Sequence, residues 1–284
     1  MFRLSFLWFA LLFGFASAAN AQNAVKSPAA APLVIGQTFT LNSKVMGEMR
    51  RINVYLPAAY QDSATLRLPV LYMPDGGLKE DFLHVAGLVQ VLTGNEGMRP
   101  FILVGIENTQ RRRDMTGPTT NAEDKKIAPK VGGSATFRQF IRTELMPEIT
   151  RRYRTTSEKA IVGESLAGLF VLETMVLEPA LFDTYVAIDP SIWWNNEQLV
   201  NQAGSLQLKE DGAPKTLYVA TSSDAQGPAA QRLDQTMRAK AGRALKWYYA
   251  PMPQETHATI YHPAALQAFR TVFKPQPVAK PTSH

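Results

Sequence analysis

The sequence predicts an α/β fold: a largely parallel central sheet with helices on both faces. Short apolar runs of strand type recur between residues 37 and 250, and segments with helical spacing lie between them. Strands buried on both faces form continuous apolar runs, and their alternation with helices is typical of parallel sheets. With 284 residues, 45% of them hydrophobic and 19% charged, the chain has an ordinary globular composition, and one domain is the simplest interpretation.

Residues 1–21 are expected to be a secretory signal peptide rather than part of the fold. Arg3 supplies a positive start, an apolar segment runs from Leu4 to Ala16, and Ala19-Asn20-Ala21 forms an A-x-A site for cleavage after Ala21. The apolar segment is short for a bilayer span, which makes an uncleaved anchor the weaker interpretation. The sequence has no cysteine, which excludes disulfides and a lipid-modified cysteine. We therefore expect a periplasmic or secreted protein without a stable membrane anchor.

The domain is expected over residues 37–275, between a flexible leader and a flexible tail. The leader, residues 22–36, is rich in alanine and proline, and the tail is residues 276–284. Two paired strands are expected at the start of the domain, at Gln37–Leu41 and Arg51–Leu56.

The next part of the chain contains a strand, a helix, a second strand and a long loop. The strand Pro69–Met73 ends at the turn signal Pro74-Asp75-Gly76-Gly77. A helix from about Asp81 to Leu92 and a buried strand Phe101–Ile106 follow. The polar segment Asn108–Gly133 is the longest expected loop. Loops of this length are often lids or binding loops, although plain insertions are about as common.

The second half of the domain continues the alternation. Four apolar residues, Phe137, Ile141, Leu145 and Ile149, recur every four positions and predict a one-sided helix that ends near Arg154. Four more strands are expected, at Ala160–Val162, Thr184–Ile188, Leu217–Ala220 and Leu245–Ala250, with helical segments between them. A helix at His262–Phe273 closes the domain.

Ser165 lies where an expected strand ends and an expected helix begins. Gly163 precedes it by two positions and Ala167 follows it by two. A serine nucleophile presented on a sharp strand-to-helix turn needs such small neighbours, although the usual pattern has glycine at the second place. A serine that caps the following helix explains the same residues, so both interpretations stay open at this point.

His257 is the best candidate for the base that a nucleophilic serine needs. The sequence has four histidines: His284 is terminal, His84 lies in an expected helix before the serine, and His262 opens the last helix. His257 lies in the loop after the last strand. It also follows Ser165 along the chain, as it does in hydrolases with the order serine, acid, histidine.

Six further segments strengthen these assignments. They are VLYMPDGG, the R-x-R-D of Arg111 to Asp114, VGGSATFRQFIRTELMPEITRRYR, VGESLAG, IDPSIWWN and ETHATIYHPA. In these segments, which cover residues 37 to 273 in order, the chain resembles the esterase family of α/β hydrolases, and within it the branch of siderophore esterases. The resemblance implies the α/β-hydrolase fold, with helices on both faces of a mostly parallel sheet.

The resemblance also implies roles for individual residues. Ser165 is the expected nucleophile and His257 the expected base. The backbone N–H groups of Leu166 and Gly77 are the expected oxyanion hole. Trp193 and Trp194 are expected to line the substrate cleft, with ordinary core packing as the alternative. Two arginines of the long loop, Arg111 and Arg113, are expected either to bind substrate or to pair with Asp114.

The third member of the triad is assigned to Asp224. It follows the expected strand Leu217–Ala220, the usual place for the acid that orients the histidine. Asp189 follows the preceding strand, but relatives often carry serine there, which argues against it. Glu255 lies two positions before His257 and is a second alternative. A Ser–His pair without an acid is the third, since some relatives work in this way.

The expected activity is hydrolysis of a carboxylic ester through an acyl-enzyme on Ser165, and a siderophore-like ester is one substrate class. Acyl transfer by the same residues and a non-catalytic ligand-binding module are the alternatives. No metal or organic cofactor is expected, since the sequence has no H-E-x-x-H motif. The 30 Lys and Arg exceed the 24 Asp and Glu without an aromatic-interleaved basic segment, so nucleic-acid binding is not expected. The sequence leaves the oligomeric state undetermined.

Overall fold

The computed structural model describes residues 30–208 and 213–275. The chain divides into a unit that ends at Val34 and a compact unit that begins at Ile35. Residues 30–34 of the first unit are exposed and form neither helix nor strand. The expected signal peptide, most of the expected leader and the expected tail lie outside the described residues.

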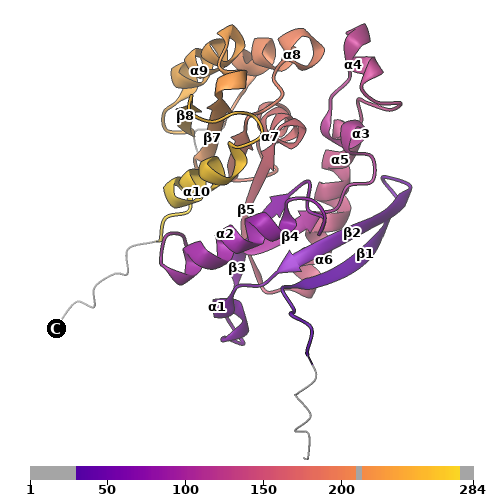
Figure 1. Ribbon diagram of the computed structural model, residues 1–284, viewed down its shortest axis with the longest axis vertical. Helices are drawn as coiled ribbons and strands as arrows, with labels where there is room; N and C mark the ends of the chain where they lie inside the picture. The colour runs from indigo at the N-terminus through magenta and orange to yellow at the C-terminus, as the bar shows by residue number, and fades with distance from the viewer. Residues whose placement is uncertain (1–29, 209–212, 276–284) are drawn as a thin grey trace, which may run out of the picture. The chain divides into compact units, whose positions relative to one another are not determined.

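The second unit contains an eight-stranded sheet with the order β1-β2-β4-β3-β5-β6-β7-β8 (Figure 1). β2 runs antiparallel to both of its neighbours, and every pair from β4 to β8 is parallel. The expectation of a largely parallel sheet is therefore confirmed. The strands are β1 (Gln37–Ser43), β2 (Glu48–Tyr55), β3 (Leu68–Met73), β4 (Ile102–Ile106), β5 (Thr155–Glu164), β6 (Thr184–Ile188), β7 (Lys215–Ser222) and β8 (Leu245–Met252).

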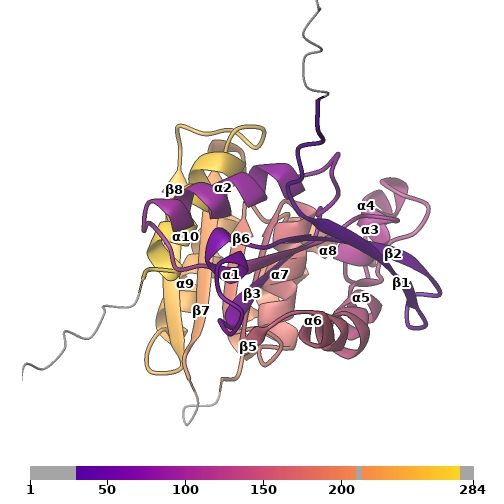
Figure 2. The same ribbon diagram turned by 90° about the horizontal axis from the view of Figure 1, so that it is seen from below.

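Helices cover both faces of this sheet. Residues of α2 and α10 pack on one face, and residues of α5 to α9 pack on the other; Figure 2 shows α2 apart from α6 and α7 in this way. The α-helices are α1 (Ala58–Gln61), α2 (Phe82–Gly94), α3 (Arg111–Met115), α4 (Ala122–Lys126), α5 (Ser134–Phe140), α6 (Met146–Arg152), α7 (Leu166–Leu177), α8 (Trp194–Gln202), α9 (Pro228–Lys240) and α10 (Tyr261–Val272). Three other helical segments are η1 (Ile141–Leu145), η2 (Ala203–Ser205) and η3 (Ser223–Ala225).

The apolar run of β3 shows why the buried strands lack a polar face. Val70 and Tyr72 pack into the core on one side of the sheet, and Leu71 and Met73 pack into the core on the other side. Successive side chains of a strand point to opposite faces, so a strand covered on both faces needs apolar residues at every position.

The helix after the long loop keeps its four-residue apolar spacing because it contains a π-helical turn. Phe137, Ile141, Leu145 and Ile149 are all buried. A spacing of four drifts around an α-helix of 3.6 residues per turn. The wider turn η1 between α5 and α6 compensates for this drift, because each hydrogen bond there spans five residues.

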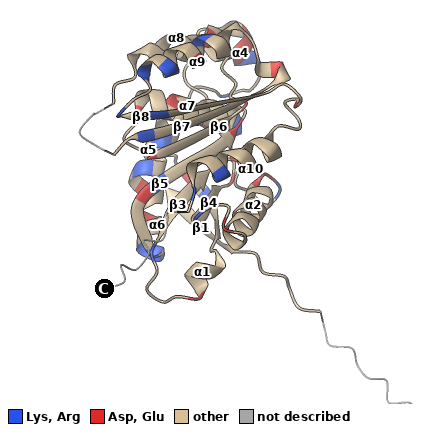
Figure 3. Ribbon diagram, turned by 90° about the vertical axis from the view of Figure 1, so that its left-hand side faces the viewer, with Lys and Arg blue, Asp and Glu red and all other residues tan. Residues whose placement is uncertain are grey.

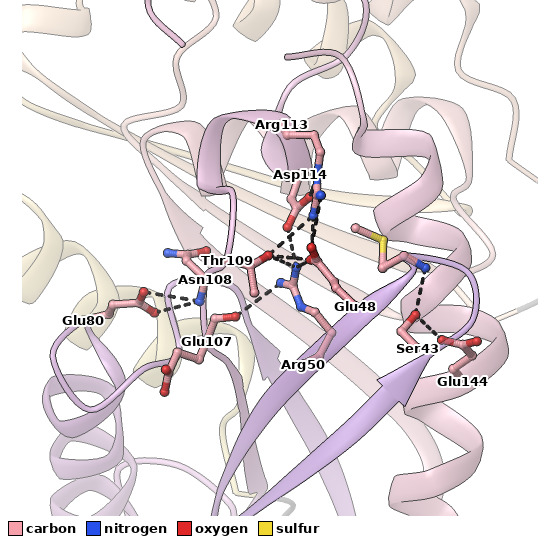
Figure 4. Close-up of polar contacts among 11 residues, drawn as sticks. Ser43, Glu48, Arg50, Glu80, Glu107, Asn108, Thr109, Arg113, Asp114 and Glu144 are labelled. Atoms are coloured by element: carbon pink, nitrogen blue, oxygen red, sulfur yellow. Dashed lines mark hydrogen bonds and ion pairs between the residues drawn. The ribbon is translucent and has the colours of Figure 1, made fainter. Parts of the chain in front are cut away.

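The long segment between β4 and α5 is anchored to the sheet by a buried ion network (Figure 4). Arg50 of β2 donates to Asp114 of α3 at 2.6 Å, and both side chains are 0% exposed. Arg50 also donates to Glu48 at 2.9 Å and to Thr109 at 2.7 Å, and Arg113 donates to Asp114 at 2.6 Å. The segment also contains α3 and α4, so the expected loop is partly helical.

Removal of one carboxylate from this network should destabilise the fold. Asp114→Ala leaves Arg50 and Arg113 with Glu48 as their remaining carboxylate, and an uncompensated buried charge costs about 3–5 kcal/mol. We expect a loss of this size in urea unfolding at pH 7, and a fall of about 10 °C in Tm. Glu123→Ala is the control, because Glu123 pairs with Lys126 and both side chains are more than two-thirds exposed. Its effect should stay within about 0.5 kcal/mol, and equal effects of the two variants would contradict the prediction.

Candidate active site

Ser165 stands on a strained turn between β5 and α7. Its φ of 81° and ψ of −109° lie in a region that non-glycine residues rarely adopt. A Cβ on Gly163 would lie 2.7 Å from atoms of Ala167, so this neighbour must be glycine for the turn to close. The Ser165 side chain makes no capping hydrogen bond to α7. These observations favour the nucleophile turn over the capping interpretation.

His257 is the histidine that contacts this serine. It lies in the loop between β8 and α10, and its Nε2 is 3.1 Å from Ser165 Oγ. The two other described histidines, His84 and His262, contact each other through ring nitrogens 3.0 Å apart. The expected pairing of Ser165 with His257 is therefore present in the geometry.

The carboxylate beside the histidine ring belongs to Asp189, and the assignment to Asp224 is wrong. Asp189 Oδ2 lies 2.6 Å from His257 Nδ1. The Asp189 side chain is 1% exposed and also accepts hydrogen bonds from Ser222, from its backbone N–H at 2.7 Å and its hydroxyl at 2.8 Å. These bonds hold the carboxylate beside the His257 ring. Asp189 follows β6 directly, which is the sequence signal that could have identified it.

Asp224 holds the backbone of the histidine loop instead of the ring. Its Oδ2 accepts the backbone N–H of His257 at 2.8 Å. Glu255 contributes its backbone carbonyl, which accepts the Ser223 N–H at 2.9 Å. Among the hydrogen bonds of the described residues, the Glu255 side chain makes none to the His257 ring.

The surroundings of His257 favour its protonated form. Partial burial lowers the pKa of His257, but the hydrogen bond to Asp189 and the charges of Glu164, Asp189 and Asp224 outweigh burial. The pKa of His257 therefore lies above its usual value. Such a shift strengthens the imidazole as a base once it is deprotonated.

One of the two expected oxyanion donors is already occupied. Leu166 opens α7, so its N–H has no partner one turn earlier in the helix and can bind an anion. The Gly77 N–H donates to the Glu80 carboxylate at 2.7 Å. A glutamate three positions into the turn reaches back in this way in a capping box. In this structure the expected Gly77 donor is therefore engaged by Glu80, and its role in an oxyanion hole stays a prediction.

The two expected cleft tryptophans have different environments. Trp193 is 52% exposed and lines a cavity of about 370 Å³ together with Ser165, Asp189, Ser191 and His257. Trp194 is 4% exposed and donates its indole N–H to the Gly117 carbonyl at 2.9 Å. Trp193 thus lies at the cavity beside Ser165, and its contact with substrate stays a prediction, whereas Trp194 packs in the core as in the alternative interpretation.

The segment that carries Trp193 is held by the long loop. Asn195, Asn196 and Glu197 all have positive φ values, between 49° and 61°, and form a left-handed turn directly after the two tryptophans. Such backbone is unfavourable for residues other than glycine unless contacts hold it. Asp124 accepts the Asn195 N–H at 2.8 Å, and Asn195 Oδ1 accepts the Thr120 N–H at 2.9 Å. The loop thereby fixes one wall of the cavity, which the sequence alone did not indicate.

The arginines of the long loop are bound to carboxylates of the protein. Arg111 donates to Asp75 through Nε at 2.7 Å and Nη2 at 2.8 Å. Arg113 pairs with Glu48 and Asp114, as the alternative interpretation held. Both line a separate cavity of about 480 Å³ that does not include Ser165 or His257. Neither arginine is among the described residues that line the cavity beside Ser165.

Charge pairing and hydrogen bonding also account for the basic cluster of Arg151, Arg152 and Arg154. Figure 3 shows basic and acidic residues interspersed along α5 and α6. Arg151 and Arg152 pair with Glu148, and Arg154 donates to backbone carbonyls of Tyr60 and Ser63.

Two further side chains beside the nucleophile were not singled out from the sequence. Ser191 is buried, and its Oγ lies 3.4 Å from Ser165 Oγ. Glu164 directly precedes Ser165, and its Oε1 lies 3.5 Å from His257 Nε2. The position of Glu164 next to Ser165 was the available signal for Glu164, whereas Ser191 lies 26 positions from Ser165 and no local signal links the two.

Residues 30–208 and 213–275 contain neither a metal-binding cluster nor a membrane-spanning helix. No group of three or more His, Cys, Asp or Glu residues is arranged to hold a metal ion there. Among the helices of these ranges, none combines the length and the apolar character that a membrane span requires.

Comparison with known proteins places this geometry among esterases. The sequence profile of the family described as "Putative esterase" matches residues 43–261. A 165-residue match to the ferri-bacillibactin esterase BesA of Bacillus subtilis is 32% identical and covers 52% of this chain and 56% of that relative. A 224-residue match to the siderophore triacetylfusarinine C esterase of Aspergillus fumigatus is 30% identical and covers 71% of this chain and 72% of that relative. The chain thus spans little more than half the length of the Bacillus relative.

A solved structure supports the same placement. The crystal structure of an IroE-like serine hydrolase from Shewanella oneidensis superposes with a TM-score of 0.74 at 27% identity. The superposition covers 84% of this chain and 80% of the Shewanella chain. The fold and the sequence match therefore point to the same family.

Proposed function

This chain belongs to the putative esterase family and to its siderophore esterase-like branch, and from that premise we propose that it is a serine esterase that forms an acyl-enzyme on Ser165. The observation that carries the proposal is the chain of contacts from Ser165 Oγ to His257 Nε2 at 3.1 Å and from His257 Nδ1 to Asp189 Oδ2 at 2.6 Å. Nucleophile, base and orienting acid lie within hydrogen-bond reach of one another, the arrangement that activates a serine.

The proposed reaction proceeds in two steps. His257 Nε2 accepts the hydroxyl proton of Ser165 while Oγ attacks the ester carbonyl, and Asp189 stabilises the imidazolium that forms. The imidazolium then returns the proton to the departing alcohol, and the acyl group stays on Ser165. In the second step, water loses a proton to His257 and attacks the acyl-enzyme; the imidazolium then returns that proton to Ser165 Oγ as the acid leaves.

The Leu166 N–H is the proposed donor to the oxyanion of both tetrahedral intermediates. It stands at the N-terminus of α7, where the helix dipole also favours negative charge. If Gly77 provides a second donor, its N–H must first exchange the Glu80 carboxylate for the oxyanion.

The proposed substrate is a small-molecule ester of the siderophore type. The relatives named above act on ferri-bacillibactin and triacetylfusarinine C, and the half-exposed Trp193 offers an aromatic wall beside Ser165. We also propose that the protein is exported to the periplasm or secreted, on the pattern of its first 21 residues.

Covalent labelling tests this proposal directly. A fluorophosphonate probe should add one label per chain, and peptide mass mapping should place it on Ser165, because the probe reacts with serines activated by a base. Ser165→Ala is the matched control and should take up no label. A folded wild-type protein that never labels would favour a non-catalytic binding module, and a label on another serine would move the nucleophile.

A further inference from the structure

Glu164 is a half-buried carboxylate that approaches the side of His257 where the proton is transferred. It ends β5, and its side chain is 16% exposed. Its Oε1 lies 3.5 Å from His257 Nε2, the same nitrogen that faces Ser165 Oγ at 3.1 Å. Among the hydrogen bonds of the described residues, none reaches the Glu164 carboxylate, so the contact with His257 is its closest polar interaction there.

The His257 ring therefore lies between carboxylates on both of its nitrogens. Asp189 binds Nδ1 at 2.6 Å, and Glu164 faces Nε2. A protonated ring has an N–H on each nitrogen and can donate to both carboxylates. The neutral ring that must accept the serine proton has one N–H and donates it to Asp189 alone. From this arrangement we propose that Glu164 is a positioning residue that acts through His257: it stabilises the imidazolium on the Nε2 side and sets the pH above which the base becomes free. This inference rests on the proposed esterase function.

The charges around the pair agree with this role. Burial raises the pKa of Glu164 to about 7, and this effect outweighs the lowering by His257 and Arg111. Asp189 and Asp81 also raise it. The pKa of His257 lies above its usual value, and the charge of Glu164 is one of the causes. Both shifts favour a proton held by this pair, and while that proton occupies Nε2 the ring cannot accept another.

The groups that face this pair come from several elements. Asp189 follows β6, Asp224 lies in η3, Arg111 lies in α3, and Asp81 stands before α2. Three of these four groups are acidic, so the surroundings of the pair favour retention of its proton.

Glu164 neither gains nor loses a proton in the proposed catalytic cycle. The proton taken from Ser165 sits on Nε2 in the tetrahedral intermediate, within reach of both Glu164 and the departing oxygen. Glu164 stabilises the ring while it carries that charge, and the proton then leaves with the alcohol. At low pH the same attraction lowers the activity, because His257 of the free enzyme is already protonated before substrate binds.

The test is the pH profile of Glu164→Gln. With p-nitrophenyl acetate as substrate, the acid limb of kcat/KM should move to lower pH by about one unit, since loss of a neighbouring negative charge lowers the pKa of His257. The plateau at alkaline pH should fall by less than about tenfold. Glu255→Gln is the matched control, since Glu255 lies in the His257 loop without a bond to the ring, and its acid limb should stay at the wild-type position.

A second readout separates this inference from the esterase assignment. Titration of the His257 ring by ¹H–¹⁵N NMR should give a lower pKa in Glu164→Gln than in wild type, whether or not the protein hydrolyses the test ester. An active, folded Glu164→Gln variant with the wild-type acid limb and the wild-type ring pKa would overturn the role of Glu164 and leave the esterase proposal intact. A wild-type protein without hydrolysis or labelling would overturn the esterase proposal. The NMR titration would still show whether Glu164 raises the pKa of His257.

Discussion

Ser165→Ala should reduce hydrolysis of p-nitrophenyl acetate to the background rate while the Tm stays close to that of wild type. The variant loses the atom that is proposed to form the acyl-enzyme, and losses of this kind in serine hydrolases reach about six powers of ten in kcat. The fold should tolerate the change because the Ser165 side chain caps no helix and the backbone demand of the turn is the same for alanine. Steady-state kinetics and a thermal melt of the same preparation measure the two effects.

The companion variant, His257→Ala, identifies the partner of the serine. Residues that act as a unit are not additive, so His257→Ala should be nearly as damaging as Ser165→Ala, and the double variant should be no worse than either. His262→Ala should be mild, because His262 contacts His84 and not the nucleophile. Substantial activity in Ser165→Ala would place the nucleophile elsewhere and remove the central proposal.

Asp189→Asn should lower kcat by about three to four powers of ten. The imidazole would lose both the charge that stabilises its protonated form and the acceptor that fixes its tautomer. The amide has nearly the volume of the carboxylate, so the buried site should keep its packing, and binding of a non-hydrolysable analogue should change little. Measured kcat, with the analogue Kd beside it, checks both statements.

Asp224→Asn is the matched control for this experiment. The amide oxygen can still accept the His257 backbone N–H that Asp224 binds at 2.8 Å. We therefore expect a loss below about tenfold, which corresponds to some 1.4 kcal/mol of barrier. A large loss in Asp224→Asn together with a small one in Asp189→Asn would reverse the assignment of the acid. Small losses in both would leave a Ser165–His257 pair as the mechanism.

The sequence by itself determined the elements of the domain and two members of the proposed site. The observed strands lie within a few residues of those expected because burial on both faces forces continuous apolar runs, which are local in the chain. Ser165 could be found because a strained turn needs small residues at fixed distances from it, with Gly163 against Ala167. His257 could be found because the sequence offers four histidines and the other three stand in unsuitable places.

Only the tertiary structure decided the partners of these two residues. Asp189 and Asp224 follow β6 and β7, which are neighbouring parallel strands, so both reach the same edge of the sheet. The bonds from Ser222 hold Asp189 at the His257 ring, whereas Asp224 accepts the backbone N–H of the same histidine. The place of each aspartate after a strand is the same in the sequence, so the sequence pattern did not distinguish the two.

The same reason explains the other differences between expectation and structure. Trp193 and Trp194 are neighbours in the chain, but the backbone orients one toward the cavity beside Ser165 and the other toward Gly117. Arg111 and Arg113 find their partners in Asp75 and in a network with β2 that no local pattern indicates. Periodicity reports which residues are buried along one element, whereas the choice of a polar partner depends on distances between elements that are far apart in the chain.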